Sequence, residues 1–352
     1  MAMRAVFAHA ISRFWSREAA AGLAWRRVRP RAPRPTSSAR WVTARSSDVE
    51  SPKDDRRAKA GARRMREDAA RAADALAAEA AKSSAAAASS SPRARRALDR
   101  LAAYAKRGDA IKGFFEPGLL RLYLQLDHVH ESRDVRGALG EIGVYHGKSF
   151  VPLALLRRPD ERCVAVDCFA DQDANVDASG EGDRVAFERN LAASLAACAP
   201  DPESREDTSD RWLRILEMDS THLGIDPSPL RAAVHDAPYR IFSVDGCHTA
   251  EATAADLAAA AAVIHPEGVV IVDDAFNPDW PGVMTGLFEW TRGGGELAPF
   301  AVGYNKVFMC PPSARKTYFE AFEDGARKTA KFMGSEVAVY PHGWISTFHG
   351  NE

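Results

Sequence analysis

The sequence predicts an α/β protein built around a mostly parallel sheet. From residue 136 onward, short apolar runs alternate with Ala-rich stretches of helical composition, which is the pattern of repeated βαβ units. Acidic residues or glycines follow these runs, at the strand ends where a parallel sheet of this kind binds its ligands. Two final apolar runs follow each other too closely for a crossover helix, so they predict an antiparallel pair.

The same pattern gives the expected elements in order. Strands are predicted at 138–143, 163–169, 213–219, 240–246 and 268–274. Helices are predicted near 148–157, 183–198 and 249–263, the last with Thr249 as its N-cap and Glu251 in its first turn. A further helix runs from 281 through Trp290 and ends at a run of three glycines, and the runs 297–303 and 305–310 form the antiparallel pair.

Composition divides the chain into five segments. Residues 1–47 contain ten Arg, no Lys and one acid, and their apolar residues recur at helical spacing. This pattern predicts an organelle transit peptide, mitochondrial in preference to plastid, with an untargeted basic tail as the alternative. Residues 48–96 are poor in large apolar side chains, so we expect a low-complexity linker that is disordered or loosely helical. Residues 97–134 predict a helical lead-in or cap, 135–310 the main domain, and 311–352 a C-terminal helix and tail packed on that domain.

Charge and cysteine content narrow the class of function. The net charge is −1, but residues 97–352 hold 25 basic and 39 acidic side chains. An acidic folded part argues against a nucleic-acid partner and favours a small-molecule substrate. Five sparse cysteines without a CxxC pair indicate reduced thiols. The longest apolar run, 257–264, is far shorter than the roughly 20 residues of a membrane span, so we expect a soluble protein with no membrane partner.

The segment EIGVYHGKS carries the sharpest local signal. A strand reaches Glu141, and glycines at 143 and 147 flank a turn into a helix, where backbone N–H groups are free to meet a ligand. A P-loop needs four residues between its glycines, and here there are three. A dinucleotide fingerprint needs glycine where Tyr145 stands. A plain strand-to-helix turn is a further alternative.

Acids at the next two strand ends extend this signal. Asp167 follows Gly143 by 24 residues, which is one βαβ unit, and an acid at this place accepts hydrogen bonds from ribose hydroxyls in doubly wound folds. Asp219 and Ser220 end the following strand, where they would border an adenine or its ribose. An exposed turn is the alternative for these last two residues.

Two later strand ends carry more acids than a fold requires. Asp245 and His248 follow one strand, and Asp273 and Asp274 follow the next, with Asn277 and Asp279 just beyond. Carboxylates gathered at one sheet edge repel one another unless a cation neutralises them, and oxygen ligands suit Mg²⁺. The cation would bind a substrate hydroxyl and lower its pKa, and His248 would serve as general base. A strand end for Asp273 and a helix cap for His248 are the alternatives.

A polar run at 171–182, DQDANVDASGEG, alternates acids as a calcium loop does. Val176 stands where such a loop requires glycine, and Gly182 stands where it requires a bidentate Glu. We therefore predict a polar loop over the cofactor or substrate.

These motifs together resemble class I S-adenosylmethionine (SAM)-dependent methyltransferases over residues 135–310. The carrying residues are EIGVYHGKS, VAVDCF, EMDS, SVDGCHT, EGVVIVDD and NKVFMC. The chain is most similar to the methyltransferase domain 24 family, which is related to metal-dependent sugar O-methyltransferases. It departs from the sugar enzymes after the fourth strand, where D-G-C-H-T-A-E lacks their usual Tyr.

The resemblance implies a Rossmann-like fold whose seven-stranded, mostly parallel sheet has an antiparallel last strand and helices on both faces. With the strand-end residues above, it implies SAM bound by Glu141, Gly143, Gly147, Asp167, Asp219 and Ser220. It implies Mg²⁺ at Asp245, Asp273 and Asp274, with His248 and Asp245 catalytic. We expect O-methylation of a small hydroxylated metabolite. A non-catalytic SAM-fold binding protein, or an NAD-linked or hydroxylase-like enzyme on the same scaffold, is the alternative.

Overall fold

A computed structural model describes residues 71, 74, 91–173, 175–199 and 209–341. These residues lie within one compact unit, 52–352. The predicted transit peptide and nearly all of the predicted linker lie outside the described residues, as does the end of the predicted tail.

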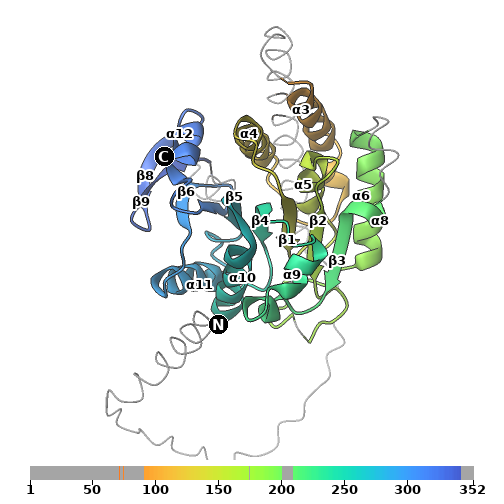
Figure 1. The fold of residues 1–352 in the computed structure, drawn as a ribbon. Helices are drawn as coiled ribbons and strands as arrows, with labels where there is room; N and C mark the ends of the chain where they lie inside the picture. The colour runs from red at the N-terminus through yellow and green to blue at the C-terminus, as the bar shows by residue number, and fades with distance from the viewer. Residues whose placement is uncertain (1–70, 72–73, 75–90, 174, 200–208, 342–352) are drawn as a thin grey trace, which may run out of the picture. The chain divides into compact units, whose positions relative to one another are not determined.

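The described residues form one nine-stranded sheet in the order β3-β2-β1-β4-β5-β7-β6-β9-β8 (Figure 1). The strands are β1 Ala138–Ile142, β2 Cys163–Asp167, β3 Leu213–Glu217, β4 Tyr239–Val244, β5 Ile264–Val272, β6 Ala298–Gly303, β7 Lys306–Cys310, β8 Lys328–Phe332 and β9 Ser335–Val339. Neighbours among β1 to β5 pair in parallel, and β7 is antiparallel to both β5 and β6. The prediction of a mostly parallel sheet with an antiparallel pair at 297–310 is therefore confirmed.

The predicted count of seven strands is wrong, because a C-terminal hairpin adds β8 and β9. Strand β9 pairs in parallel with β6, and β8 pairs antiparallel with β9. Met333 and Gly334 join the two strands with φ of 47° and 78°, as a tight two-residue hairpin turn requires. Neither the Met-Gly pair nor the largely exposed β8 gives a strong sequence signal. The segment after 310 is thus a helix followed by two strands of the sheet.

Helices cover both faces of the sheet. They are α3 Pro92–Ala105, α4 Leu119–Ser132, α5 Phe150–Leu156, α6 Arg184–Cys198, α8 Ser209–Trp212, α9 Ser228–Ala233, α10 Ala250–Val263, α11 Pro281–Arg292 and α12 Arg315–Glu323, with short 3₁₀ turns η1 Gly108–Ala110 and η2 Ser220–Gly224. Strand β5 divides its side chains between the two cores, with Val269 and Ile271 in one and Val270 and Val272 in the other. Such continuous apolar strands are typical of a sheet buried on both faces.

The helical lead-in begins earlier than the sequence predicts. Helix α3 starts at Pro92, and the Ser91 hydroxyl accepts a hydrogen bond from the N–H of Ala94 at 3.0 Å, as an N-cap does. Residues 92–96 therefore belong to a helix rather than to the linker. At α10 the predicted N-cap is confirmed, since the Thr249 hydroxyl accepts from the N–H of Ala252 at 3.2 Å.

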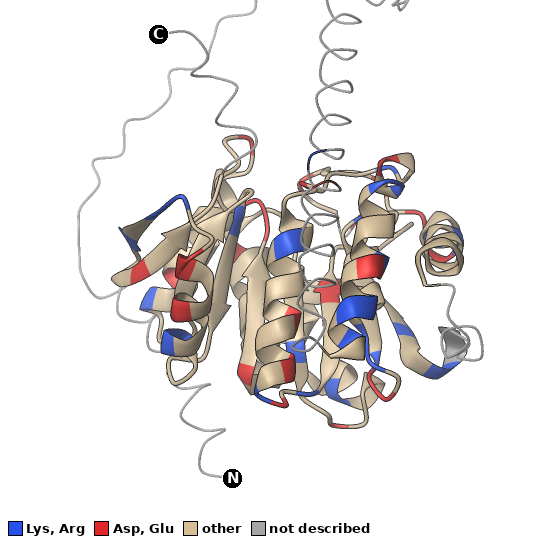
Figure 2. Cartoon of the chain, turned by 90° about the horizontal axis from the view of Figure 1, so that it is seen from above, with Lys and Arg blue, Asp and Glu red and all other residues tan. Residues whose placement is uncertain are grey.

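Acidic and basic side chains are interspersed over the helices seen in Figure 2. In the part of the chain that the structure describes, no helix is long and apolar enough to cross a membrane.

Candidate active site

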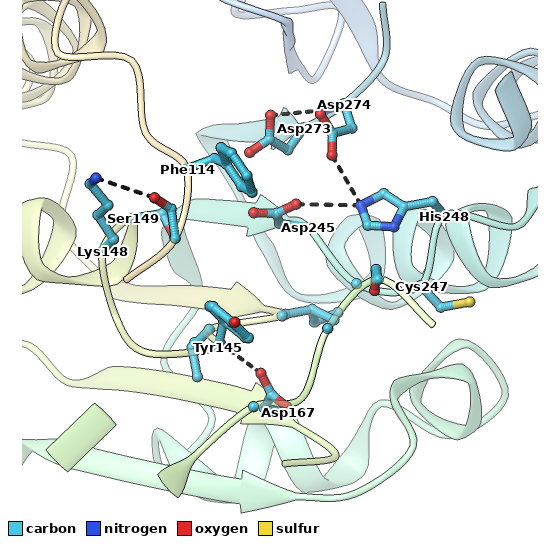
Figure 3. A pocket seen from close by; sticks show the side chains of 18 of the residues that line it. Phe114, Tyr145, Lys148, Ser149, Asp167, Asp245, Cys247, His248, Asp273 and Asp274 are labelled. Carbon is cyan, nitrogen blue, oxygen red and sulfur yellow. Dashed lines mark hydrogen bonds and ion pairs between the residues drawn. The ribbon is translucent and has the colours of Figure 1, made fainter. Parts of the chain in front are cut away.

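The carboxyl ends of β1, β2, β4 and β5 open into one cavity of about 530 Å³, a volume within the roughly 300–1,000 Å³ usual for small-molecule sites. Its walls are the loops that follow these strands, the turn η2, the lead-in residues 112–116 and part of the loop 175–182. The polar loop predicted to lie over the ligand site is therefore found there. Figure 3 shows Asp167 with Tyr145 on one side of this cavity and His248 with two acids on the other.

The glycine loop brings the ends of β1 and β4 into contact. Gly143 has φ +83°, and a Cβ there would lie 1.7 Å from the carbonyl oxygen of Asp245. Only glycine permits this approach. Gly147, at φ +92°, packs against the ring of Phe187. Of these two glycines, only Gly143 lines the cavity.

Glu141 lies behind the cavity wall. Its side chain is fully buried and does not line the cavity. Burial raises the pKa of its carboxyl to about 8, although the ammonium of Lys306 opposes the shift. Two of the six predicted cofactor-binding residues, Glu141 and Gly147, thus shape the loop from behind, because their positions on the strand and turn face the core.

The other predicted cofactor-binding residues line the cavity. Asp167 accepts hydrogen bonds from the backbone N–H groups of Tyr145 and Phe169, each at 2.7 Å. These bonds fix its carboxylate against the glycine loop, while burial still raises its pKa. Asp219 accepts from the N–H of Thr221 at 2.9 Å and from its hydroxyl at 2.7 Å, so it caps η2 and holds Ser220 at the cavity wall.

His248 faces two carboxylates on the opposite side. Its Nε2 atom lies 3.1 Å from Oδ2 of Asp274 and 3.9 Å from Oδ1 of Asp245. One potential ligand atom from each of these three residues lies within 4.8 Å of the others. The imidazole ring stacks on Trp280 with centroids 4.6 Å apart, which restricts its rotation.

The other ring nitrogen of His248 meets a residue from the loop 175–182. Nδ1 lies 2.7 Å from Oδ2 of Asp177, and the backbone N–H of His248 donates to the same oxygen at 2.6 Å. Burial alone would lower the pKa of His248, but the carboxylates of Asp274 and Asp177 outweigh it and raise that pKa.

Asp273 is paired differently from the other two acids. The buried ammonium of Lys306 forms an ion pair with its Oδ2 atom, and its Oδ1 atom accepts from the N–H of Asp274 at 2.8 Å. Burial would lower the pKa of Lys306, but Asp273 and its neighbours raise it. Asp245 and Asp274 therefore lie beside His248, whereas Asp273 forms an ion pair with Lys306.

Sequence reasoning missed Asp177, Lys306 and Trp280. Asp177 comes from a loop 71 residues before His248, and Lys306 begins the antiparallel strand β7. Asp177 lies within the predicted polar run 171–182 and Lys306 within the motif NKVFMC, but the sequence alone gives neither residue a role. Their only available signal was a polar loop after β2 and a lysine directly before an apolar strand.

One family model matches part of the chain, and several solved structures are similar to it. Residues 141–275 match a family model described as "Methyltransferase domain". No curated protein matches the chain. Similar solved structures include the calicheamicin methyltransferase CalS11, at 20% identity and a TM-score of 0.41 over 54% of this chain and 79% of that one.

Two other similar structures carry ligands. The O-methyltransferase TomG from Streptomyces achromogenes, in complex with SAM, has 18% identity and a TM-score of 0.37 over 62% of this chain and 89% of that one. The methyltransferase MycE, in complex with Mg and SAH, has 15% identity and a TM-score of 0.39 over 60% of this chain and 54% of that one. Likenesses this distant assign no residue roles.

The strand order β3-β2-β1-β4-β5 is that of a doubly wound nucleotide-binding sheet, and the family match spans its glycine loop and both acidic strand ends. Residues 141–275 therefore match a methyltransferase domain, and they lie on a Rossmann-like fold.

Proposed function

We propose that this protein transfers a methyl group from SAM to a hydroxyl oxygen of a small metabolite, with help from a divalent cation. One observation carries the proposal. A single cavity is lined at one side by Gly143 and Asp167 and at the other by Asp245, His248 and Asp274. A methyl donor on the first side and a metal-bound or deprotonated hydroxyl on the second would share that cavity.

The cofactor side suits a nucleoside that carries a polar tail. Asp167 would accept hydrogen bonds from the ribose hydroxyls, and Asp219 and Ser220 would border the ribose or adenine. Gly143 has no side chain to keep a ligand from the loop backbone. When bound, SAM supplies a methyl group on a sulfonium that is already a good leaving group, so proximity and alignment provide most of the rate.

The acceptor side supplies a base. His248 would take the hydroxyl proton on Nε2 while the oxygen attacks the methyl carbon. The new O–C bond would replace the C–S bond of the donor, whose sulfur would keep the electron pair, leaving S-adenosylhomocysteine (SAH). His248 would hold the proton until it passes to water after the product leaves.

The residues present fit a divalent cation. Oxygen atoms of the Asp245 and Asp274 carboxylates lie within 4.8 Å of each other at the cavity wall, and oxygen ligands of this kind suit Mg²⁺. Asp245 and Asp274 would hold the cation, which would lower the pKa of a bound hydroxyl. Asp273 is less suited to ligation than the sequence predicts, because Lys306 already neutralises it.

Binding of Mn²⁺, measured by electron paramagnetic resonance on the full chain with SAH present, tests the cation. We expect Asp274→Asn to weaken Mn²⁺ binding at least tenfold, about 1.4 kcal/mol, because an amide oxygen carries no charge. Asp160→Asn, at an exposed acid remote from the cavity, should leave it unchanged. Equal affinities in the two variants would remove the cation from the proposal.

The location of the protein is part of the same proposal. The Arg-rich composition of residues 1–47 supports an organelle, the mitochondrion in preference to the plastid.

A further inference from the structure

Asp177 contacts the candidate base His248 from a separate loop, the loop 175–182. Its contacts determine which ring nitrogen of His248 carries the hydrogen. Its side chain is 6% exposed. Its Oδ2 atom receives the backbone N–H of His248 at 2.6 Å and lies 2.7 Å from Nδ1 of that residue. Its Oδ1 atom accepts from the N–H of Ser179 at 3.1 Å.

We infer that Asp177 is a positioning residue that fixes His248 as the Nδ1–H tautomer, with the lone pair of Nε2 directed into the cavity. The inference deepens the proposed function and rests on it, since it concerns the residue proposed as base.

The tautomer follows from what a carboxylate can do. An ionised carboxyl group only accepts hydrogen bonds, so the Nδ1 atom beside it must carry the hydrogen. Burial raises the pKa of Asp177, but hydrogen bonds from His248 and Ser179 outweigh it, and the net shift is downward. Asp177 therefore stays ionised at neutral pH and remains an acceptor.

Asp274 competes for the same proton from the other side of the ring. A neutral imidazole carries one hydrogen, and Asp274 would favour its placement on Nε2. The geometry favours Asp177, because its contact is 2.7 Å against 3.1 Å and Nε2 makes no aligned hydrogen bond among the described residues. Asp177 also holds the backbone of His248, and Asp245 at 3.9 Å is too far from Nε2 to accept its proton.

The loop that carries Asp177 also lies against the cofactor side. A Cβ at Gly180 would lie 3.2 Å from the ring of Tyr145, whose N–H donates to Asp167. The side chain of Asn175 donates to the carbonyl of Gly180 at 3.0 Å, which closes the loop on itself. The loop 175–182 thus contacts Tyr145 on the cofactor side of the cavity and His248 on the acceptor side.

The tautomer can be read directly by nuclear magnetic resonance. The full chain is labelled with ¹⁵N-histidine, saturated with SAH and studied at a pH where the ring of His248 is neutral, and His248→Gln assigns the signals. We expect the wild-type ring to carry its proton on Nδ1. In Asp177→Asn the amide can donate to Nδ1, so the proton should move largely to Nε2, as occurs when the acid of an Asp-His pair is replaced by Asn.

The matched control is Asp173→Asn, an exposed acid of the same polar run, which should keep the wild-type tautomer. A wild-type proton on Nε2, or the same tautomer in Asp177→Asn as in the wild type, would overturn the inference. The wild-type spectrum alone shows which ring nitrogen carries the hydrogen, so the inference can be tested even if Asp177→Asn does not fold. Failure of the proposed function would show separately, as a wild-type protein that does not bind SAH.

Discussion

Lys306 is a buried cation among acids. Its side chain is 3% exposed and forms an ion pair with Asp273. Asp245, whose pKa is raised far above its usual value by burial and by Asp273, also lies within electrostatic reach of the ammonium. Lys306 therefore offsets the repulsion among the half-buried acids that line the cavity.

Lys306→Met should destabilise the protein by about 2–4 kcal/mol, because it leaves the half-buried Asp273 without its counter-charge. Urea unfolding at neutral pH, followed by circular dichroism, measures this change. The added substitution Asp273→Asn should recover part of the loss, since it removes the orphaned charge.

Lys316→Met is the matched control, at a lysine that is 85% exposed and pairs with Glu320 across one helical turn. It should leave the unfolding midpoint unchanged. A Lys306→Met protein as stable as this control would show that the buried pair has no role in holding the acid cluster.

At the residue scale, the sequence predicts those site residues whose position follows from topology alone. Asp167, Asp245 and Asp274 end parallel strands, and such ends share one edge of the sheet. The partners Asp177 and Lys306 could not be predicted, because a loop conformation and the register of an antiparallel strand place them. The sequence predicts that Asp273 binds the cation, but the register of β7 places Lys306 beside it, so the two form an ion pair instead.

At the scale of elements, the turn after β1 is the most constrained junction. Gly143 takes a left-handed φ of +83°, and an added Cβ would meet the backbone that carries Asp245. Gly143→Ala should weaken SAH binding more than tenfold and lower stability by roughly 2–4 kcal/mol, because the ends of β1 and β4 must separate.

The variant Gly294→Ala distinguishes the effect of backbone strain from the effect of a steric clash at Gly143. Gly294 also has a positive φ, +104°, but nothing lies within 4 Å of its added Cβ. Gly294→Ala should lower the free energy of unfolding by about 1–2 kcal/mol through backbone strain alone, and it should leave the affinity for SAH unchanged. Calorimetry and urea unfolding of the two variants check this difference. Equal effects would mean that the contact between the strand ends does not shape the site.

The predicted elements agree with the structure where burial sets the pattern. Apart from the half-buried edge strand β3, the strands β1 to β7 have their apolar residues in the core, and their predicted positions are correct within a few residues. The hairpin of β8 and β9 was not predictable in the same way. Lys328 and Lys331 interrupt β8, and Met333-Gly334 is not a typical hairpin pair.

At the scale of the whole described unit, a second charged cluster ties the lead-in helices to the sheet. Arg240 of β4 is fully buried and contacts Glu161 at 2.8 Å and Asp127 of α4 at 3.2 Å. Arg93 of α3 reaches the same Asp127 at 2.7 Å. The lead-in is therefore part of the domain, and it contributes residues 112–116 to the cavity wall, including the 83% exposed Phe114.

Calorimetric titration of the full chain with SAH tests the central claim most directly. We predict saturable binding in the micromolar range usual for enzyme ligands. Asp167→Ala should weaken it at least tenfold, about 1.4 kcal/mol, because the ribose loses its charged acceptor. Asp171→Ala, at an exposed acid outside the cavity lining, should bind as the wild type does. No binding at millimolar SAH, or an Asp167→Ala affinity equal to that of the wild type, would contradict the account.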